Sequence, residues 1–157
     1  MSAPSIIEKL CAAGPITSIS RVGYAPFKGD DPLEIFFESG AVFYVDIGFE
    51  GATDIDVGEG PLIEHAYGHL RAEEPATFAA IERDWGHETL DLPWLEGASL
   101  TNPRRLIMTN PYRVDVGYVF DAGGKQLALF GEADWIWAIA LDDPEITQFA
   151  LEVGASL

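Results

Sequence analysis

The sequence predicts one α+β domain spanning residues 1–157 and built mostly from antiparallel sheet, and three observations support this class. Apolar and polar side chains alternate along several short segments bounded by turn residues, as they do in half-buried strands. These segments fall into two β-meander regions, at residues 16–57 and 106–141. Segments with helical spacing occur near the N-terminus, in the middle and near the C-terminus. With 48% hydrophobic residues, the chain can bury its own core.

The first meander follows a short helix that is predicted at residues 4–13 and that Gly14 and Pro15 terminate. A strand is expected at residues 16–25. Strands at 33–38 and 41–49 are expected to form a hairpin through Ser39 and Gly40, and a further strand is expected at 53–57.

Side chains two positions apart share one face of a strand, so this meander sorts its residues into two sets. The apolar set is expected to face the core and contains Leu33, Ile35, Phe37, Phe43, Val45, Ile47, Phe49, Ile55 and Val57. The opposite set, named the acidic face here, contains six carboxylates and two aromatic rings: Glu34, Phe36, Glu38, Tyr44, Asp46, Glu50, Asp54 and Asp56.

Two helices are predicted in the middle of the chain, at residues 61–71 and 75–85, each with a proline in its first turn. Proline is tolerated there because the N–H that it lacks has no partner within the helix. Gly86 is expected to end the second helix. Residues 87–102 show little periodicity and are expected to form a loop.

The second meander comprises predicted strands at residues 106–109, 114–121, 125–132 and 134–141, with a hairpin through Gly123 and Gly124. The last of these strands is apolar on both faces, which favours a central place in its sheet. A closing helix is predicted at residues 144–153, with Asp143 as its N-cap and Pro144 at its first position.

Negative charge is concentrated in two stretches that contain no lysine or arginine. Residues 29–70 hold ten carboxylates, and six more follow Lys125, in a chain with a net charge of −17. A field of one sign accelerates encounter with an oppositely charged partner. Nucleic acid and anionic membranes are poor matches, because both need basic side chains and the chain has nine in all. A basic protein is the expected partner, and Arg104, Arg105 and Arg113 are expected to pair with surplus carboxylates.

No motif of nucleophilic, phosphate-binding or dinucleotide-binding enzymes is present, and no cofactor is expected. His65 and His69 are spaced i, i+4 on a predicted helix and are weak candidates for metal ligands, with Glu64, Glu73 or His87 as additional donors. The glutamate precedes the first histidine, unlike the order in zinc proteases, and histidines at the border of an apolar stripe explain the pattern more simply.

The single cysteine, Cys11, excludes an internal disulfide and is expected to be a small buried hydrophobe on the first helix. The N-terminus lacks the basic and apolar segments of a secretory signal, and the longest apolar segment, at residues 135–141, is too short to cross a bilayer. A cytoplasmic location is therefore expected.

These features favour a small acidic binding protein and argue against an enzyme. In size, acidity, α+β layout and lack of a catalytic motif, the chain is similar to the immunity proteins that neutralise basic bacterial toxins. This similarity is a general one and assigns no role to any residue. It implies an inhibitor that occludes the active site of a toxin or effector. The acidic face is the expected interface, with Phe36 and Tyr44 for desolvated contact and the carboxylates for steering.

Three alternatives stay open from the sequence: an acidic mimic of DNA, a metal-dependent enzyme that uses His65 and His69, and an adaptor subunit of a larger assembly. The identity of the partner and the oligomeric state are not assigned by the sequence.

Overall fold

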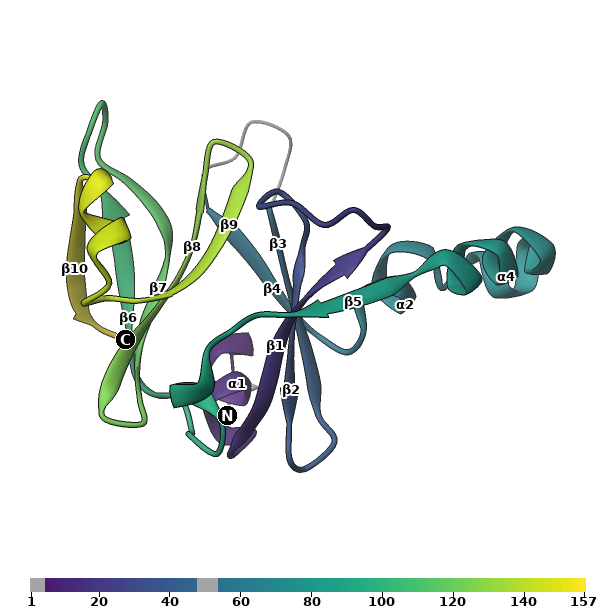
Figure 1. Cartoon of the computed structure of the whole chain (residues 1–157), viewed down its shortest axis with the longest axis horizontal. Helices are drawn as coiled ribbons and strands as arrows, with labels where there is room; N and C mark the ends of the chain where they lie inside the picture. Colours follow the sequence, from purple (N-terminus) through teal and green to yellow (C-terminus); the bar gives the residue numbers. More distant parts are fainter. Residues whose placement is uncertain (1–4, 48–53) are drawn as a thin grey trace.

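The computed structural model describes residues 5–47 and 54–157, which form two five-stranded antiparallel sheets (Figure 1). Sheet 1 has the strand order β4-β3-β2-β1-β5. Its strands are β1 Ile16–Gly23, β2 Leu33–Phe37, β3 Val42–Ile47, β4 Ile55–Glu59 and β5 Gly86–Thr89. Sheet 2 has the order β10-β6-β7-β8-β9. Its strands are β6 Thr101–Met108, β7 Val114–Ala122, β8 Lys125–Glu132, β9 Trp135–Ala140 and β10 Leu151–Ser156.

The helices in the described ranges are short and lie outside the sheets. They are α1 Ile6–Ala12, α2 Leu62–Tyr67, α3 Leu70–Glu73 and α4 Pro75–Asp84, with two 3₁₀ turns, η1 Pro93–Leu95 and η2 Pro144–Gln148. The excursion from α2 to α4 connects β4 to β5, and α4 lies at its far end, away from both sheets (Figure 1). None of the helices in these ranges has the length and apolar character that a membrane span requires.

The predicted α+β class is wrong, because the described chain is mostly antiparallel strand and its C-terminal segment is not an α-helix. Asp143 does cap the start of this segment by accepting a hydrogen bond from the backbone N–H of Glu145 at 2.9 Å. The turn that it caps, however, is the short 3₁₀ element η2, and the chain then continues into β10. Pairing with β6 satisfies the backbone groups of β10 that helical bonds would otherwise satisfy. Pairing with β6 of sheet 2 is thus more favourable for these residues than the helix that their spacing predicts.

Three smaller predictions also change. The last apolar strand, β9, lies at the edge of sheet 2, although apolar clusters on both sheet faces include its residues. The predicted loop at 87–102 contributes most of β5, which pairs with β1. Gly86 belongs to β5 and does not cap α4, whose C-cap is Trp85. The outcome for β5 and Gly86 depends on their pairing with β1, a contact between residues far apart in sequence that local patterns do not reveal.

The alternation predicted for the first meander is confirmed. Every described member of its apolar set belongs to the main hydrophobic core or packs against it, and Phe49 lies outside the described residues. Side chains of α1 and of sheet 2 complete this core, including Ile7, Leu10, Phe120, Leu127, Leu129 and Ile136. Burial of apolar surface common to both sheets is the main force that holds them together.

Two arginines add polar links between the sheets. The half-buried guanidinium of Arg21 donates hydrogen bonds to the carbonyl oxygens of Asp31 at 2.9 Å and Ile136 at 2.8 Å. Arg105 of β6 forms an ion pair with Asp54, just before β4, at 2.6 Å. The bond from Arg21 to Ile136 and the ion pair of Arg105 with Asp54 each join a strand of one sheet to the other sheet or to the residue next to it, so they help to fix the relative position of the sheets.

Candidate functional site

The acidic face lies on the side of sheet 1 opposite the main core, and α2 covers part of it. Leu62 of α2 is buried in a small cluster with Val22 and Tyr44 of the sheet, and Trp85 packs against this cluster. The acidic face is therefore not the open surface that strand alternation predicts.

Glu34 was expected on this exposed face, but its side chain is buried, with 2% exposure. One carboxylate oxygen accepts a hydrogen bond from the backbone N–H of Leu62 at 2.7 Å, and the other lies 2.9 Å from Nε2 of His87. The N–H groups at the start of a helix have no partner inside it, so Glu34 caps α2 from a neighbouring strand. The expected exposure of Glu34 is wrong, and the residue holds α2 against sheet 1 and links β2 to β5 within that sheet.

Tyr44 is also buried, with 6% exposure, and it forms part of the platform on which α2 rests. Its ring stacks on that of His65 with centroids 4.5 Å apart, and its hydroxyl lies 3.2 Å from His65 Nδ1. Gly58 on β4 leaves room for the ring, since a Cβ there would lie 2.0 Å from Cζ of Tyr44. Tyr44 therefore positions His65 and is not the exposed anchor that the sequence predicts.

Asp46 and Asp56 face each other across β3 and β4 and keep the expected acidic character of the face. Asp46 is partly buried, and this burial raises the pKa of its carboxyl group. The negative charge of Asp56 raises that pKa further, whereas a hydrogen bond from the backbone N–H of Ile47 and the proximity of His65 lower it. Asp56 itself is exposed.

The other predicted residues of the acidic face are dispersed. Phe36 is half-buried beside the ring of His87, with centroids 5.7 Å apart. Glu38 is exposed beyond the end of β2. Asp54 forms its ion pair with Arg105 of sheet 2, and Glu50 lies outside the described residues.

The two candidate metal ligands do not lie on the same helix. His65 belongs to α2, whereas His69 is the residue that precedes α3. A possible additional donor, Glu64, is in an ion pair with Arg71. Over residues 5–47 and 54–157, no group of three or more His, Cys, Asp or Glu side chains is arranged to hold a metal ion.

A pocket of about 310 Å³ opens beside α2 on this side of sheet 1. We name it the aromatic pocket, and the side chains that give it its chemistry are Tyr24, Asp31, Asp46, His65, Tyr67 and Trp85. They come from the segment between β1 and β2, from β3, from α2 and from the C-terminal end of α4.

Trp85 meets two tyrosine rings of the pocket edge-to-face. The ring of Trp85 meets that of Tyr24 at 81° with centroids 5.8 Å apart, and that of Tyr67 at 81° with centroids 6.1 Å apart. Edge-to-face contacts are a favoured geometry of aromatic pairs, so they stabilise the positions of these rings. Nε1 of Trp85 is buried, and it has no hydrogen-bond partner within the described part of the chain.

The electrostatics of the aromatic pocket favour a cation. Asp31 and Asp46 both line it, and none of its described lining residues is a lysine or arginine. The faces of aromatic rings carry negative charge density, which adds to the attraction of the carboxylates. Burial strengthens both effects by reducing screening by water and salt.

The sequence predicts Asp46 as a site residue but gives no indication of Tyr24, Tyr67 or Trp85. Tyr24 falls within the predicted first strand, and Trp85 within the apolar side of a predicted helix. The three residues meet because α4 leads directly into β5, which pairs with β1. That pairing has no local signature, so periodicity alone could not have found the pocket.

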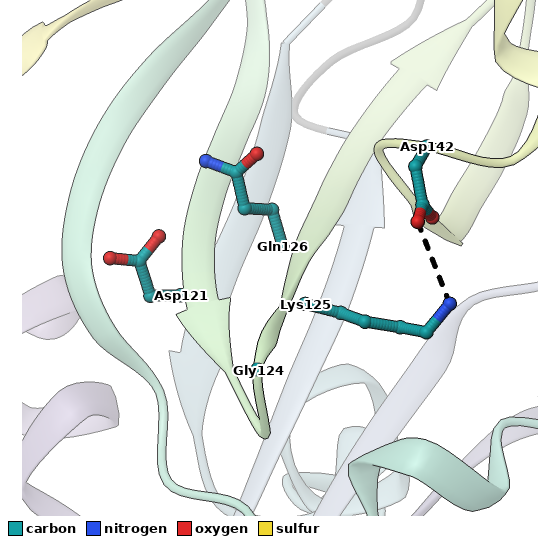
Figure 2. A pocket seen from close by; sticks show the side chains of 5 residues that line it. All are labelled: Asp121, Gly124, Lys125, Gln126 and Asp142. Carbon is teal, nitrogen blue, oxygen red and sulfur yellow. Dashed lines mark ion pairs between the residues drawn. The ribbon is translucent and has the colours of Figure 1, made fainter.

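A second hollow, of about 460 Å³, lies at the β7–β8 hairpin of sheet 2 (Figure 2). The side chain of Lys125 extends across it toward Asp142, with Nζ 3.6 Å from the carboxylate. Asp121 on the other side bonds to Arg104 and Asn102, and the hydrogen bond from Asn102 is the main cause of the lowered pKa of its carboxyl group. The charged groups of this hollow are therefore all in ion pairs, Lys125 with Asp142 and Asp121 with Arg104.

The arginines at 104, 105 and 113 pair with carboxylates, as the sequence predicts. Their partners are Asp121, Asp54 with Asp115, and Glu152. These ion pairs neutralise part of the negative charge of the chain.

The chain matches no protein-family model, and searches of curated proteins and of solved structures find no significant match. Function must therefore be argued from the site itself.

Proposed function

We propose that this chain is an acidic binding protein of the immunity type, which inhibits a basic protein by covering its active site. One observation supports this most strongly: aromatic rings and carboxylates adjoin in a pocket whose described lining contains no lysine or arginine. Rings that lose water on contact supply binding energy, and charges around them guide the approach and fix the orientation of the partner.

The proposed interface differs from the one that the sequence predicts. Glu34 and Tyr44 lie between α2 and sheet 1 and hold α2 in place. They therefore shape the proposed interface without contacting the partner. Asp46 and the exposed Asp56 are retained as contacts, and Tyr24 joins them with 46% of its surface exposed. The concentration of negative charge in residues 29–70 then accelerates encounter over a longer range.

The test is binding to a purified basic partner, and the product of the adjacent reading frame is the first to try. Association rates are compared for the natural chain and the double variant Asp46→Lys, Asp56→Lys at low and moderate salt. Loss of electrostatic steering should slow association by roughly tenfold or more at low salt and flatten its salt dependence. Inhibition of the partner's activity should weaken in parallel.

The matched control is Glu132→Lys in β8 with Glu145→Lys in η2, which changes the net charge by the same amount. If both double variants slowed association equally, the acidic face would not be the interface. Retention of a DNA-binding protein that duplex DNA displaces would favour the mimic of DNA. A stable stoichiometric complex without any inhibited activity would favour the adaptor.

A further inference from the structure

We infer that the aromatic pocket binds the side chain of an arginine residue presented by the partner. This assignment rests on the proposed function and specifies which chemical group of the basic partner enters sheet 1. It is drawn from two features of the pocket: the arrangement of its rings and the position of its carboxylates.

The rings favour a flat cation. Tyr24 and Tyr67 both meet Trp85 at 81°, so the walls of the pocket are aromatic surfaces in different orientations. A guanidinium group is planar and weakly hydrated, and it stacks on aromatic faces while its N–H groups stay free in its own plane. An ammonium group is compact and strongly hydrated, and it gains less from such walls.

The carboxylates provide acceptors for those N–H groups. Asp31 and Asp46 line the pocket on separate segments, the first preceding β2 and the second on β3. One oxygen of Asp46 accepts the backbone N–H of Ile47 at 2.8 Å, so the carboxylate is held in place by its own strand. An arginine carries five N–H donors and can serve more than one carboxylate at once.

The other charges around the pocket differ in sign. Arg21 lies close to Asp31 and offsets part of its negative charge, although its guanidinium donates its hydrogen bonds to main-chain carbonyl oxygens. His65 is held by its stacking contact with Tyr44, and Asp56 adds negative charge next to Asp46. Burial of Asp46 beside Asp56 raises its pKa, and an entering cation would relieve this repulsion.

The indole of Trp85 lines the pocket, so its N–H group can report on a bound ligand. Nε1 is itself buried and has no hydrogen-bond partner within residues 5–47 and 54–157. A ligand in the pocket would therefore change the chemical shift of this N–H through the neighbouring rings and charges, and not through a direct hydrogen bond.

The assignment is tested on the full chain by NMR titration with N-acetyl-arginine methylamide. The indole N–H of Trp85 serves as the reporter, identified among the four tryptophans by its loss in Trp85→Phe. We expect a saturable shift with a dissociation constant in the millimolar range, as for a single side chain. The citrulline analogue, which has the same shape without charge, should bind at least roughly tenfold more weakly.

Two variants complete the design. Asp46→Asn, checked for an unchanged fold by the dispersion of its spectrum, should weaken the arginine probe by roughly three- to tenfold. The control, Glu145→Gln in η2, should bind the probe like the natural chain. Equal binding of the arginine and citrulline probes, or shifts confined to the hollow at Lys125 and Asp142, would overturn the assignment.

This titration does not involve the partner, so its failure is distinguishable from failure of the proposed function. No saturable shift of Trp85 would overturn the arginine site even if a basic partner bound to the acidic face. A saturable and charge-dependent shift would support the site even if the adjacent gene product did not bind.

Discussion

The outer faces of the two sheets are closed in different ways. On sheet 2, the face is covered by an apolar cluster in which the ring of Phe130 stacks with Trp137 at 6.2 Å and meets Phe149 edge-on at 5.4 Å. On sheet 1, the corresponding cover is α2, which is attached through one buried leucine, the carboxylate of Glu34 and the stacking of His65 on Tyr44. The first face is packed, whereas the second retains a pocket.

This difference separates stability from the proposed binding within one fold. Both sheets contribute to the main core. Sheet 2 uses its outer face for further burial of apolar surface. Sheet 1 uses its outer face to support a short helix over charged groups, an arrangement that stabilises less but leaves aromatic rings and carboxylates accessible.

The largest effect is expected from truncating the packed face. Phe130→Ala should lower the free energy of unfolding by about 3–5 kcal/mol, because Phe130 is fully buried and its loss leaves a cavity among rings that cannot collapse freely. Urea denaturation followed by tryptophan fluorescence measures this change.

The matched variant on sheet 1 is Leu62→Ala. Its expected loss is about 2 kcal/mol, at the lower end for a buried leucine, because α2 can detach without unfolding the sheet. Equal losses of global stability for the two variants would show that both outer faces are packed alike. That result would contradict the difference described between the two sheets.

A smaller effect is expected from removing the polar attachment of α2. Glu34→Ala leaves the backbone N–H of Leu62 without its buried acceptor, which should cost about 1–3 kcal/mol. The loss should appear as faster amide hydrogen exchange in residues 62–67, with much less change in sheet 2.

Glu34→Gln is the control, since its amide oxygen can still accept the bond from Leu62. It should recover part of the protection against exchange. Unchanged exchange in Glu34→Ala would contradict the role of this carboxylate in capping α2.

The smallest effect concerns Asp46 and depends on pH. Its pKa is raised in the folded state, so the protonated form is favoured there and the residue contributes stability below its unfolded pKa. That contribution is lost as the pH rises through the folded pKa. Asp46→Asn should therefore raise stability at neutral pH by about 0.5 kcal/mol.

At a pH below the unfolded pKa of an aspartate, about 3.9, Asp46→Asn should differ little from the natural chain. Urea denaturation at both pH values measures the two differences. If Asp46→Asn stabilised the protein more in acid than at neutral pH, the result would contradict the raised pKa of Asp46 in the folded state.

Strand alternation was sufficient to predict the core side of the first meander. Leu33, Ile35 and Phe43 lie in the main core because the period of two is a property of the strand itself. The hairpin at Gly123 and Gly124 was equally predictable, since both residues adopt the positive φ that such turns require, at 58° and 81°.

The same reasoning failed where a distant segment competed. Residues 151–156 carry part of a helical pattern, but the edge of β6 offered them backbone partners. Glu34 has the polarity of a surface residue, but the start of α2 offered its carboxylate a buried donor. In both cases the deciding partner lies far away along the chain, where no local rule applies.

The sequence by itself determined the antiparallel pairing within each meander, the residues that face the core and the location of the negative charge in residues 29–70. These follow from local periodicity and from composition. Only the tertiary structure decided that α2 covers the acidic face, that β10 forms the edge of sheet 2 and that Tyr24, Tyr67 and Trp85 surround a pocket beside Asp46. The physical reason is that buried donors, acceptors and apolar surfaces must find partners, and the chain satisfies many of them between segments far apart in sequence.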